Sequence, residues 1–343
     1  MTKPRQQQTI ISRHSAHEIL DRLRQGESLS PAQLSFRGAS LRGEDLSGLD
    51  LFGADFSGAD LSEANLTGAR LFTAKFVNAL LIKARLQGAE LTGCDLSGAN
   101  LEGANAREVG LGMANLSGAR LFNCNLSRAT LTKTNLEKAD LRCAKLRHAR
   151  MREAQLIGAD LTEADLYGIH LSLSDVKHSI FNNADMREAR LRRIVNFEKA
   201  EWIGVDIRDI NFSGAYRVRR FIVDQNYLYE YKNISRFSRI IYTIWLITSD
   251  CGRSLFRWCV CITLLTLAFA WLYTFVGIDY GENPNWIAPI YFSVVTLSTL
   301  GYGDILPVTP IARLVSLIEV VTGYLMLGGL LSIFANKMAR RGE

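Results

Sequence analysis

The sequence predicts a multidomain chain, in which an N-terminal solenoid precedes an α-helical membrane domain with two spans. Three observations support this prediction. An apolar residue recurs every five positions from Phe36 to Leu191, two apolar segments near the C-terminus are each long enough to cross a bilayer, and a shorter apolar segment lies between them. The length of 343 residues and the hydrophobic fraction of 48% suit a chain that is part soluble and part membrane-embedded.

The N-terminal region, residues 1–35, is predicted to cap the solenoid. Residues 15–26 read as a short amphipathic helix that carries Ile19, Leu20 and Leu23 on one face and ends at Gly26. A solenoid needs such a cap because its first coil would otherwise expose its core. The region is polar and has no apolar signal-peptide segment, so we expect it to fold in the cytosol.

The solenoid itself is predicted over residues 36–216. The residue at each fifth position is usually Leu, and the residue three positions later is small, as in the pair Phe56 and Ala59. This period fits neither a strand nor a helix, whereas a fixed short period over such a length indicates a solenoid. After Leu191 the register shifts by one residue, which predicts a bulge. The shifted centres are Phe197, Trp202, Ile207 and Phe212.

Segments such as Ala59-Asp60-Leu61 and Ala99-Asn100-Leu101 resemble the pentapeptide-repeat family. The resemblance implies a right-handed quadrilateral β-helix with one pentapeptide on each side. Some members of that family have an acidic face that binds topoisomerases in place of nucleic acid. Here basic and acidic residues balance at 23 each over residues 36–216, which disfavours that role and any nucleic-acid partner.

Charge on the predicted solenoid is zoned, with acidic early coils and basic middle coils. A solvated outer face explains this pattern. The alternative is a docking face for an unknown ligand, a partner protein, a neighbouring subunit or anionic lipid headgroups. The six cysteines show no metal-ligand spacing and are interpreted as reduced thiols.

Residues 217–253 are predicted to form a linker with an interfacial helix. The apolar stretch from Phe237 to Ile247 is too short for a span and lies beside basic residues, so a position on the inner membrane leaflet is favoured. A third membrane span is the alternative.

The pore domain is predicted over residues 254–343. Its first span covers about residues 255–278 and its second about 312–336, and a short helix over about 288–298 begins near Pro289. No Lys or Arg occurs between Arg257 and Arg313, whereas basic residues cluster on both flanks. The positive-inside bias therefore places both termini in the cytoplasm.

Residues 299–304 read Thr-Leu-Gly-Tyr-Gly-Asp and resemble the selectivity filter of two-span potassium channels, which are homotetramers. The resemblance covers about residues 254–340 and implies that potassium, the only metal ion expected, binds at backbone carbonyls and at the Thr299 hydroxyl. The ion-binding segment would be Thr299, Leu300, Gly301, Tyr302 and Gly303, and filter support would come from Ser298, Asp304, Tyr291 and Thr296. Leu300 replaces the usual Val, Phe292 replaces a tryptophan and so lacks its hydrogen-bond donor, and Val295 replaces a glutamate found behind the filter in some relatives. Tyr291 also replaces a tryptophan, but its hydroxyl is expected to bond Asp304.

Four residues of the second span invite a gating role. Gly323, Gly328 and Gly329 lie where such channels have a hinge, with close helix packing as the alternative. Glu319 is an ionisable residue within a span, where a charged side chain costs free energy. A hydrogen bond to a Ser or Thr of the pore helix, or protonation of the acid, would explain it; a gating or pH-sensing role is the alternative.

Taken together, the residues predict a homotetrameric potassium-selective channel of the cell (inner) membrane that conducts passively. The solenoid would be a regulatory or assembly domain, since no S4-type voltage sensor is present. The alternatives are a less selective cation channel and a membrane-tethered scaffold with a vestigial pore. No enzymatic activity and no cofactor are expected, because the sequence has no nucleophile–base set, P-loop or HExxH motif.

Overall fold

The computed structural model describes residues 13–210, 215–281 and 285–339, in two compact units, residues 1–229 and 230–343. Each unit is described by itself. The first contains the helix α1 (Arg13–Arg24), the coils of the solenoid with the 3₁₀-helix η1 (Phe197–Lys199), and most of α2 (Tyr216–Ile234). The second contains α3 (Arg236–Ser249), α4 (Leu255–Tyr273), β1 (Ile278–Asp279), α5 (Ala288–Leu297), β2 (Leu306–Pro307) and α6 (Pro310–Ala339).

Each coil of the solenoid consists of four pentapeptides. Residues 20 positions apart form parallel β-bridges, such as Asp60 with Leu80 and Leu80 with Asn100. Each side ends in a turn in which the small residue donates to the central apolar residue, as Ala59 N does to Phe56 O at 2.9 Å. The second of the two residues between them has a positive φ, 68° at Gly58. A type II turn requires this φ, which explains why Gly is frequent there. The predicted quadrilateral β-helix is confirmed.

The interior of the coils is filled by the residues that the period predicts. The central Leu side chains are almost entirely buried, as at Leu116 and Leu121, and so are the small residues after them. Aromatic centres one coil apart stack, with ring centroids 4.8 Å apart for Phe36 and Phe56 and 5.0 Å for Phe56 and Phe76. Each fully buried Leu or Phe contributes about 1.5–3 kcal/mol, so stacking of coils stabilises the domain.

The predicted change of register after Leu191 is present. Bridges join residues 20 apart up to the pair Asp175 and Val195, and 21 apart from Ile180 and Glu201 onward. The extra residue is accommodated at Asn196, which has a φ of 59° and precedes η1. Trp202 is fully buried and Ile207 partly buried in the new register, and Phe212 lies outside the described residues.

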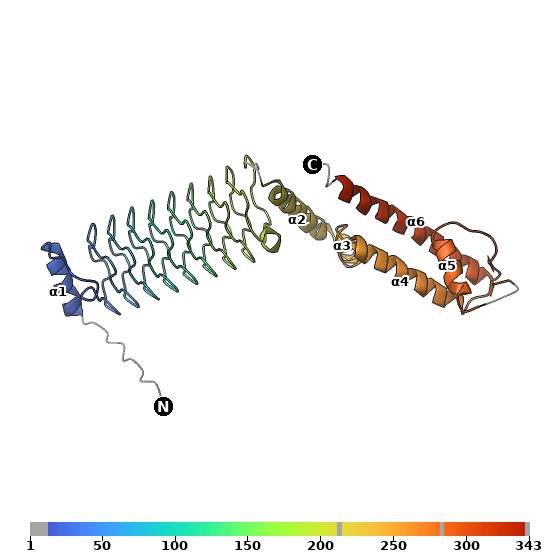
Figure 1. Cartoon of the computed structure of the whole chain (residues 1–343), viewed down its shortest axis with the longest axis horizontal. Coiled ribbons are helices and arrows are strands. Elements are labelled where there is room, and N and C mark those ends of the chain that lie inside the picture. The colour runs from blue at the N-terminus through green and yellow to red at the C-terminus, as the bar shows by residue number, and fades with distance from the viewer. Residues whose placement is uncertain (1–12, 211–214, 282–284, 340–343) are drawn as a thin grey trace, which may run out of the picture. The chain divides into compact units, whose positions relative to one another are not determined.

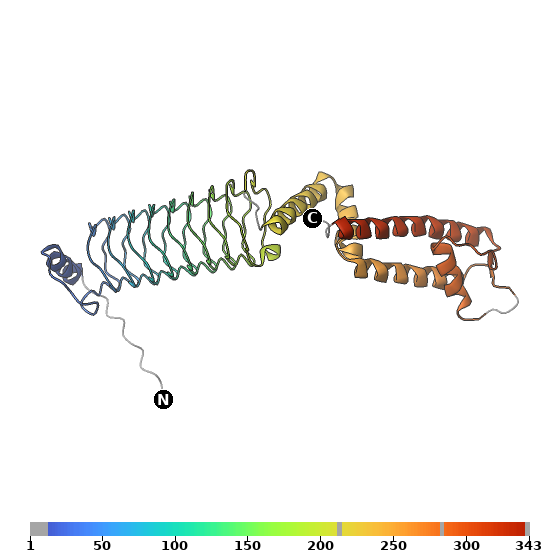
Figure 2. The same cartoon turned by 45° about the horizontal axis from the view of Figure 1, so that its top comes forward.

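Both ends of the coils are covered by helices (Figures 1 and 2). Ala16 and Leu20 of α1 are buried in the same hydrophobic core as the first coils. At the other end Val218 and Ile222 of α2 join that core. Side chains of α2 also bind the last coil: Trp202 N donates to the Gln225 side chain at 2.7 Å. Gly204 N and Trp202 O bind the Asn226 side chain at 2.7 and 2.8 Å. The first unit therefore continues beyond the predicted boundary at residue 216.

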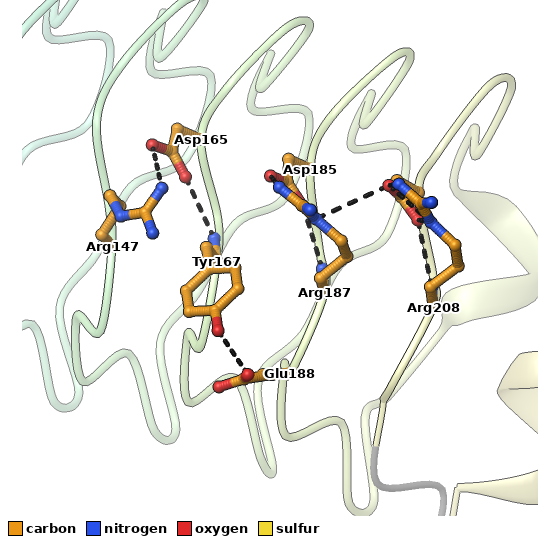
Figure 3. A network of polar contacts seen from close by, with 8 residues as sticks. Arg147, Asp165, Tyr167, Asp185, Arg187, Glu188 and Arg208 are labelled. Carbon is orange, nitrogen blue, oxygen red and sulfur yellow. Dashed lines mark hydrogen bonds and ion pairs between the residues drawn. The ribbon is translucent and has the colours of Figure 1, made fainter.

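Charged side chains on the outside of the coils pair with one another (Figure 3). Arg187 Nη2 lies 2.6 Å from Asp185 Oδ2, and its Nε lies 3.6 Å from Asp206 Oδ2 on the next coil. Asp206 also accepts from Arg208, and this hydrogen bond lowers the pKa of the Asp206 carboxyl to about 2. Part of the zoned charge is thus neutralised by local ion pairs.

The second unit is built around two long apolar helices, α4 and α6. Residues 255–273 and 310–335 are long and apolar enough to span a membrane, and only 11% and 17% of their most apolar windows are buried within the chain. Helix α3 does not meet this test, so the described residues give no support to a third span. Helix α4 ends at Tyr273, whereas the first span was predicted to extend to about residue 278. The residues after Gly277 instead form β1, which pairs with β2.

Candidate functional site

The candidate ion pathway begins at the end of the short helix α5 (Ala288–Leu297), which carries Pro289 in its first turn. This helix packs against both α4 and α6. Its buried side chains come from Phe292, Ser293, Val295, Thr296 and Leu297. Residues 299–304 follow the helix without forming a helix or strand of their own. A short helix and an irregular stretch thus connect the two long apolar helices α4 and α6, as predicted.

The backbone of the irregular stretch alternates in handedness. Thr299, Gly301 and Gly303 have φ of 60°, 50° and 79°, whereas Leu300 and Tyr302 between them do not have positive φ. Alternation of left- and right-handed residues turns successive peptide groups toward the same side, which an extended strand cannot do. A positive φ at a threonine is unfavourable, and such strain concentrates at functional sites.

The stretch is anchored to α5 at both ends. Thr299 N donates to Thr296 O and Leu300 N to Val295 O, each at 3.0 Å. At the far end the Tyr291 hydroxyl donates to Asp304 Oδ2 at 2.7 Å. The predicted bond between Tyr291 and Asp304 is therefore present. The Ser298 hydroxyl, also predicted as support, turns back to its own helix and lies 3.2 Å from Val295 O.

The side chains behind the stretch differ from the polar support expected in relatives. Phe292 is 7% exposed and packs edge-on against Tyr273 of α4, with centroids 4.8 Å apart. Val295 is equally buried. Leu300 and Tyr302 are 59% and 67% exposed in the single chain. At position 292, an apolar ring contact between α5 and α4 thus replaces the hydrogen-bond donor expected there from the resemblance.

The two long helices are joined at several points. Near the N-terminal end of α4, Trp258 Nε1 donates to Met326 O of α6 at 3.0 Å. Beyond the C-terminal end of α4, β1 pairs with β2, and Val308 N donates to Gly277 O at 3.0 Å. The contact made by Trp258 was not foreseen, although a tryptophan near the end of an apolar segment was a signal for it.

The three glycines assigned to a hinge have different surroundings within the unbroken helix α6. A Cβ added at Gly323 would lie 2.0 Å from Leu297 O, and one at Gly329 would lie 2.2 Å from Trp258 Cζ2. Nothing lies within 4 Å of a Cβ added at Gly328. Close packing thus accounts for Gly323 and Gly329, and the hinge role stays a prediction.

Glu319 lies on α6 and is fully buried. Its Oε1 contacts the Ser293 hydroxyl of α5, which bears out the predicted bond to a pore-helix serine. Its Oε2 contacts the Tyr273 hydroxyl of α4. Tyr273 was not singled out in the sequence, where its hydroxyl at the end of a span was the only signal.

A cavity of about 450 Å³ lies beside the start of the irregular stretch. It is bordered by α4, α5 and α6, and Ser298 and Thr299 contribute to its wall. The remaining wall is almost entirely apolar. No group of three or more residues suited to bind a metal ion occurs among the described side chains.

The fold and this site define a two-span membrane pore domain that follows a pentapeptide solenoid. Comparison with known families agrees: the family described as pentapeptide repeats matches residues 34–68, 74–111, 114–152 and 154–193, and the family described as ion channel matches residues 261–340. The chain therefore carries an N-terminal pentapeptide-repeat domain and a C-terminal ion channel domain, and the resemblance drawn from the sequence is confirmed.

Two curated relatives illustrate the second match. The calcium-gated potassium channel TvoK of Thermoplasma volcanium is 33% identical over 72 residues, 20% of this chain and 21% of the relative. The potassium channel protein kcv of Paramecium bursaria Chlorella virus 1 is 49% identical over 41 residues, 12% of this chain and 44% of the relative. The chain thus spans less than half of either relative.

Among solved structures, the first unit is similar to HetL, a pentapeptide repeat protein involved in heterocyst differentiation regulation from the cyanobacterium Nostoc sp. strain PCC 7120. The two are 28% identical with a TM-score of 0.34, over 57% of this chain and 98% of HetL.

Proposed function

We propose that the chain is one subunit of a homotetrameric channel that conducts potassium passively across a cell membrane. The observation that carries the proposal is the alternating backbone at Thr299, Gly301 and Gly303, held at the end of α5 between two spans. Potassium filters use rings of backbone carbonyls from four such segments to replace the water around the ion. The relatives named above are potassium channels, which supports the same ion here.

A tetramer is proposed because one segment supplies only one wall of a pore. In the single chain the filter side chains and a broad apolar surface of α6 are uncovered; Leu317, Val321 and Leu325 are 61%, 53% and 70% exposed. Four copies around an axis would cover part of this surface and would complete the ring of carbonyls. Lipid would cover the rest.

Flux into liposomes tests the proposal. The purified full-length chain is reconstituted, and potassium flux is compared with sodium flux. The variant Gly301→Ala places a side chain at a φ of 50° in the filter, and we expect it to abolish flux. The matched control is Gly281→Ala, which introduces the same kind of strain at a φ of 75° outside the filter.

Each outcome of this assay has a meaning. Potassium flux that exceeds sodium flux and disappears in Gly301→Ala supports the proposal. Equal potassium and sodium flux would replace it with a less selective cation channel. A lack of flux under every condition would favour a membrane-tethered scaffold. Chemical cross-linking in detergent tests the number of subunits, and any ladder that does not end at four contradicts the tetramer.

For regulation, we propose that the solenoid acts on the pore through residues 217–253. Helix α3 lies across the axis of α4 in both views (Figures 1 and 2), and it leaves Phe237, Ile240, Ile244 and Ile247 between 57% and 71% exposed. If α4 spans the bilayer, this apolar face would lie along the inner leaflet, with Arg236 and Arg239 near anionic headgroups. Such a helix could transmit motion to the first span.

Deletion of the first unit tests this coupling. The deletion should end at residue 229 rather than 216, because Val218 and Ile222 of α2 are buried against the last coil and would otherwise be exposed. We expect an altered open probability or impaired assembly. Unchanged single-channel records and assembly would refute a regulatory or assembly role for the solenoid.

A further inference from the structure

The carboxyl group of Glu319 connects all three helices of the pore domain. It is 0% exposed, and its two oxygens contact Ser293 of α5 and Tyr273 of α4. The Ser293 hydroxyl has a second contact, with the backbone oxygen of Thr266 of α4 at 2.9 Å. A single side chain on α6 is thus linked to both neighbouring helices, and one of its partners is linked further to α4.

The number of protons in this network decides the state of Glu319. Three contacts each need one proton: Tyr273 with Glu319, Glu319 with Ser293, and Ser293 with Thr266 O. A carbonyl oxygen can only accept, and each hydroxyl supplies one proton. Tyr273 and Ser293 therefore supply two. If the Ser293 proton goes to Thr266 O, the third proton must come from the carboxyl group itself.

The charges around Glu319 lead to the same conclusion. No Lys or Arg occurs from residue 258 to 312 or from residue 314 to 336. Among the ion pairs of the described residues, none includes Glu319. An ionised carboxylate in this position would be buried in an apolar region without a counterion, which is strongly unfavourable. The neutral acid avoids that cost and satisfies every polar atom of the network.

We propose that Glu319 is a neutral carboxylic acid that donates its proton to Ser293 and thereby positions α5 behind the filter. The protonation state follows from the contacts of the carboxyl group together with the absence of Lys and Arg in the two apolar segments, whereas the positioning role rests on the proposed function. Other titratable groups nearby are the hydroxyl of Tyr273, which donates to Oε2, and that of Tyr280, which donates to Tyr273 O at 3.0 Å. Neither supplies a positive charge.

The consequence for the filter follows from the position of Ser293 on α5. The same helix ends in the carbonyls that hold Thr299 N and Leu300 N at 3.0 Å. Because α5 has only 10 residues, a shift of Ser293 displaces those carbonyls as well. The chain of hydrogen bonds from Glu319 through Ser293 to Thr266 O therefore sets where the filter begins relative to α4 and α6.

Infrared difference spectroscopy of the reconstituted full-length chain tests the protonation state. At neutral pH we expect the difference between the natural chain and Glu319→Gln to contain the carbonyl stretch of a protonated carboxyl group. Ser293→Ala removes the acceptor of that proton and should shift the same band. Ser316→Ala is the matched control: its hydroxyl lies 3.3 Å from the Tyr273 hydroxyl, outside the carboxyl contacts. If this difference spectrum contains only the bands of an ionised carboxylate, the proposal is wrong.

Rescue by the amide tests the positioning role. Gln at position 319 can donate to Ser293 and accept from Tyr273, as the neutral acid does, whereas Ala can do neither. We expect Glu319→Ala to lower potassium flux by at least about fivefold, since a buried polar partner left unpaired shifts an equilibrium by that factor or more. Glu319→Gln should recover most of the flux.

The results separate the two parts of the proposal. If Glu319→Gln is as impaired as Glu319→Ala, the neutral hydrogen-bonding role is wrong. If Glu319→Ala fails to fold, Ser293→Ala supplies the functional test, and unchanged flux there would overturn the positioning role. If the natural chain conducts no potassium, the proposed function fails, but the infrared band still decides whether Glu319 is protonated.

Discussion

Replacement of Gly323 by Ala tests whether α6 packs directly on the end of α5. The added Cβ would lie 2.0 Å from Leu297 O, whereas ordinary contact begins at 3.4 Å, so the two helices must separate by about 1.4 Å. Overpacking of this kind costs about 1–3 kcal/mol. Because Leu297 is the last residue of α5, the separation should also disturb the filter.

Gly328→Ala is the matched control in the same helix. Nothing lies within 4 Å of its added Cβ, so the variant should gain up to about 1 kcal/mol from helix propensity. The gain in helix propensity is common to both variants, so we expect Gly323→Ala to be less stable than Gly328→Ala by the overpacking cost, about 1–3 kcal/mol. Thermal unfolding of the purified channel and liposome flux measure both effects. If Gly323→Ala matches Gly328→Ala in stability and flux, the close contact does not exist. Altered gating at unchanged stability would instead support a hinge.

Three further predictions concern the solenoid and the contact between Tyr291 and Asp304. Phe56→Ala should destabilise the solenoid by about 3–5 kcal/mol in denaturant unfolding, and Phe56→Leu far less, because most coils have Leu at this position; equal losses would contradict the packing. Tyr291→Phe removes the 2.7 Å hydrogen bond to Asp304 and should lower the barrier to the decline of current during sustained opening by about 1 kcal/mol, so that the current declines faster. An unchanged rate of decline would show that this hydrogen bond does not stabilise the filter. The lowered pKa of Asp206, about 2 against 3.8 when unfolded, adds stability above pH 3.8 that is lost as the pH falls toward 2. Arg208→Ala should weaken this acid sensitivity of the melting temperature, and an identical pH profile would refute it.

The repeat sequence could be interpreted almost completely. A five-residue period needs only local information, because every coil repeats the environment of the one before it. Even the insertion at Asn196 was visible as a shift of register. The helix that covers the C-terminal end of the solenoid could not be predicted. Gln225 and Asn226 bind the last coil from this helix, which the sequence assigned to a linker. Their amide groups look like ordinary surface residues in the sequence.

In the pore domain the motif and the order of elements were readable, but the contacts between helices were not. The departure at Phe292 suggested a missing hydrogen-bond donor, and only the structure showed that its ring packs on Tyr273. The bond from Tyr291 to Asp304 could be expected because both residues flank a known motif. The surroundings of Gly323 and Gly328 could not be distinguished, since both are glycines on one uninterrupted helix.

By itself, the sequence determined the two kinds of domain, the motif that we propose as the ion pathway and the presence of a carboxyl group within an apolar helix. These features depend on periodicity, on length and on a short motif, all of which are local. The tertiary structure decided what that carboxyl group does. Glu319 meets Tyr273 and Ser293, which lie 46 and 26 residues away on other helices, and Ser293 meets Thr266 O on α4. Only the packing of three helices brings these atoms together, and their contacts, together with the absence of a nearby cation, are the basis on which we propose a neutral Glu319.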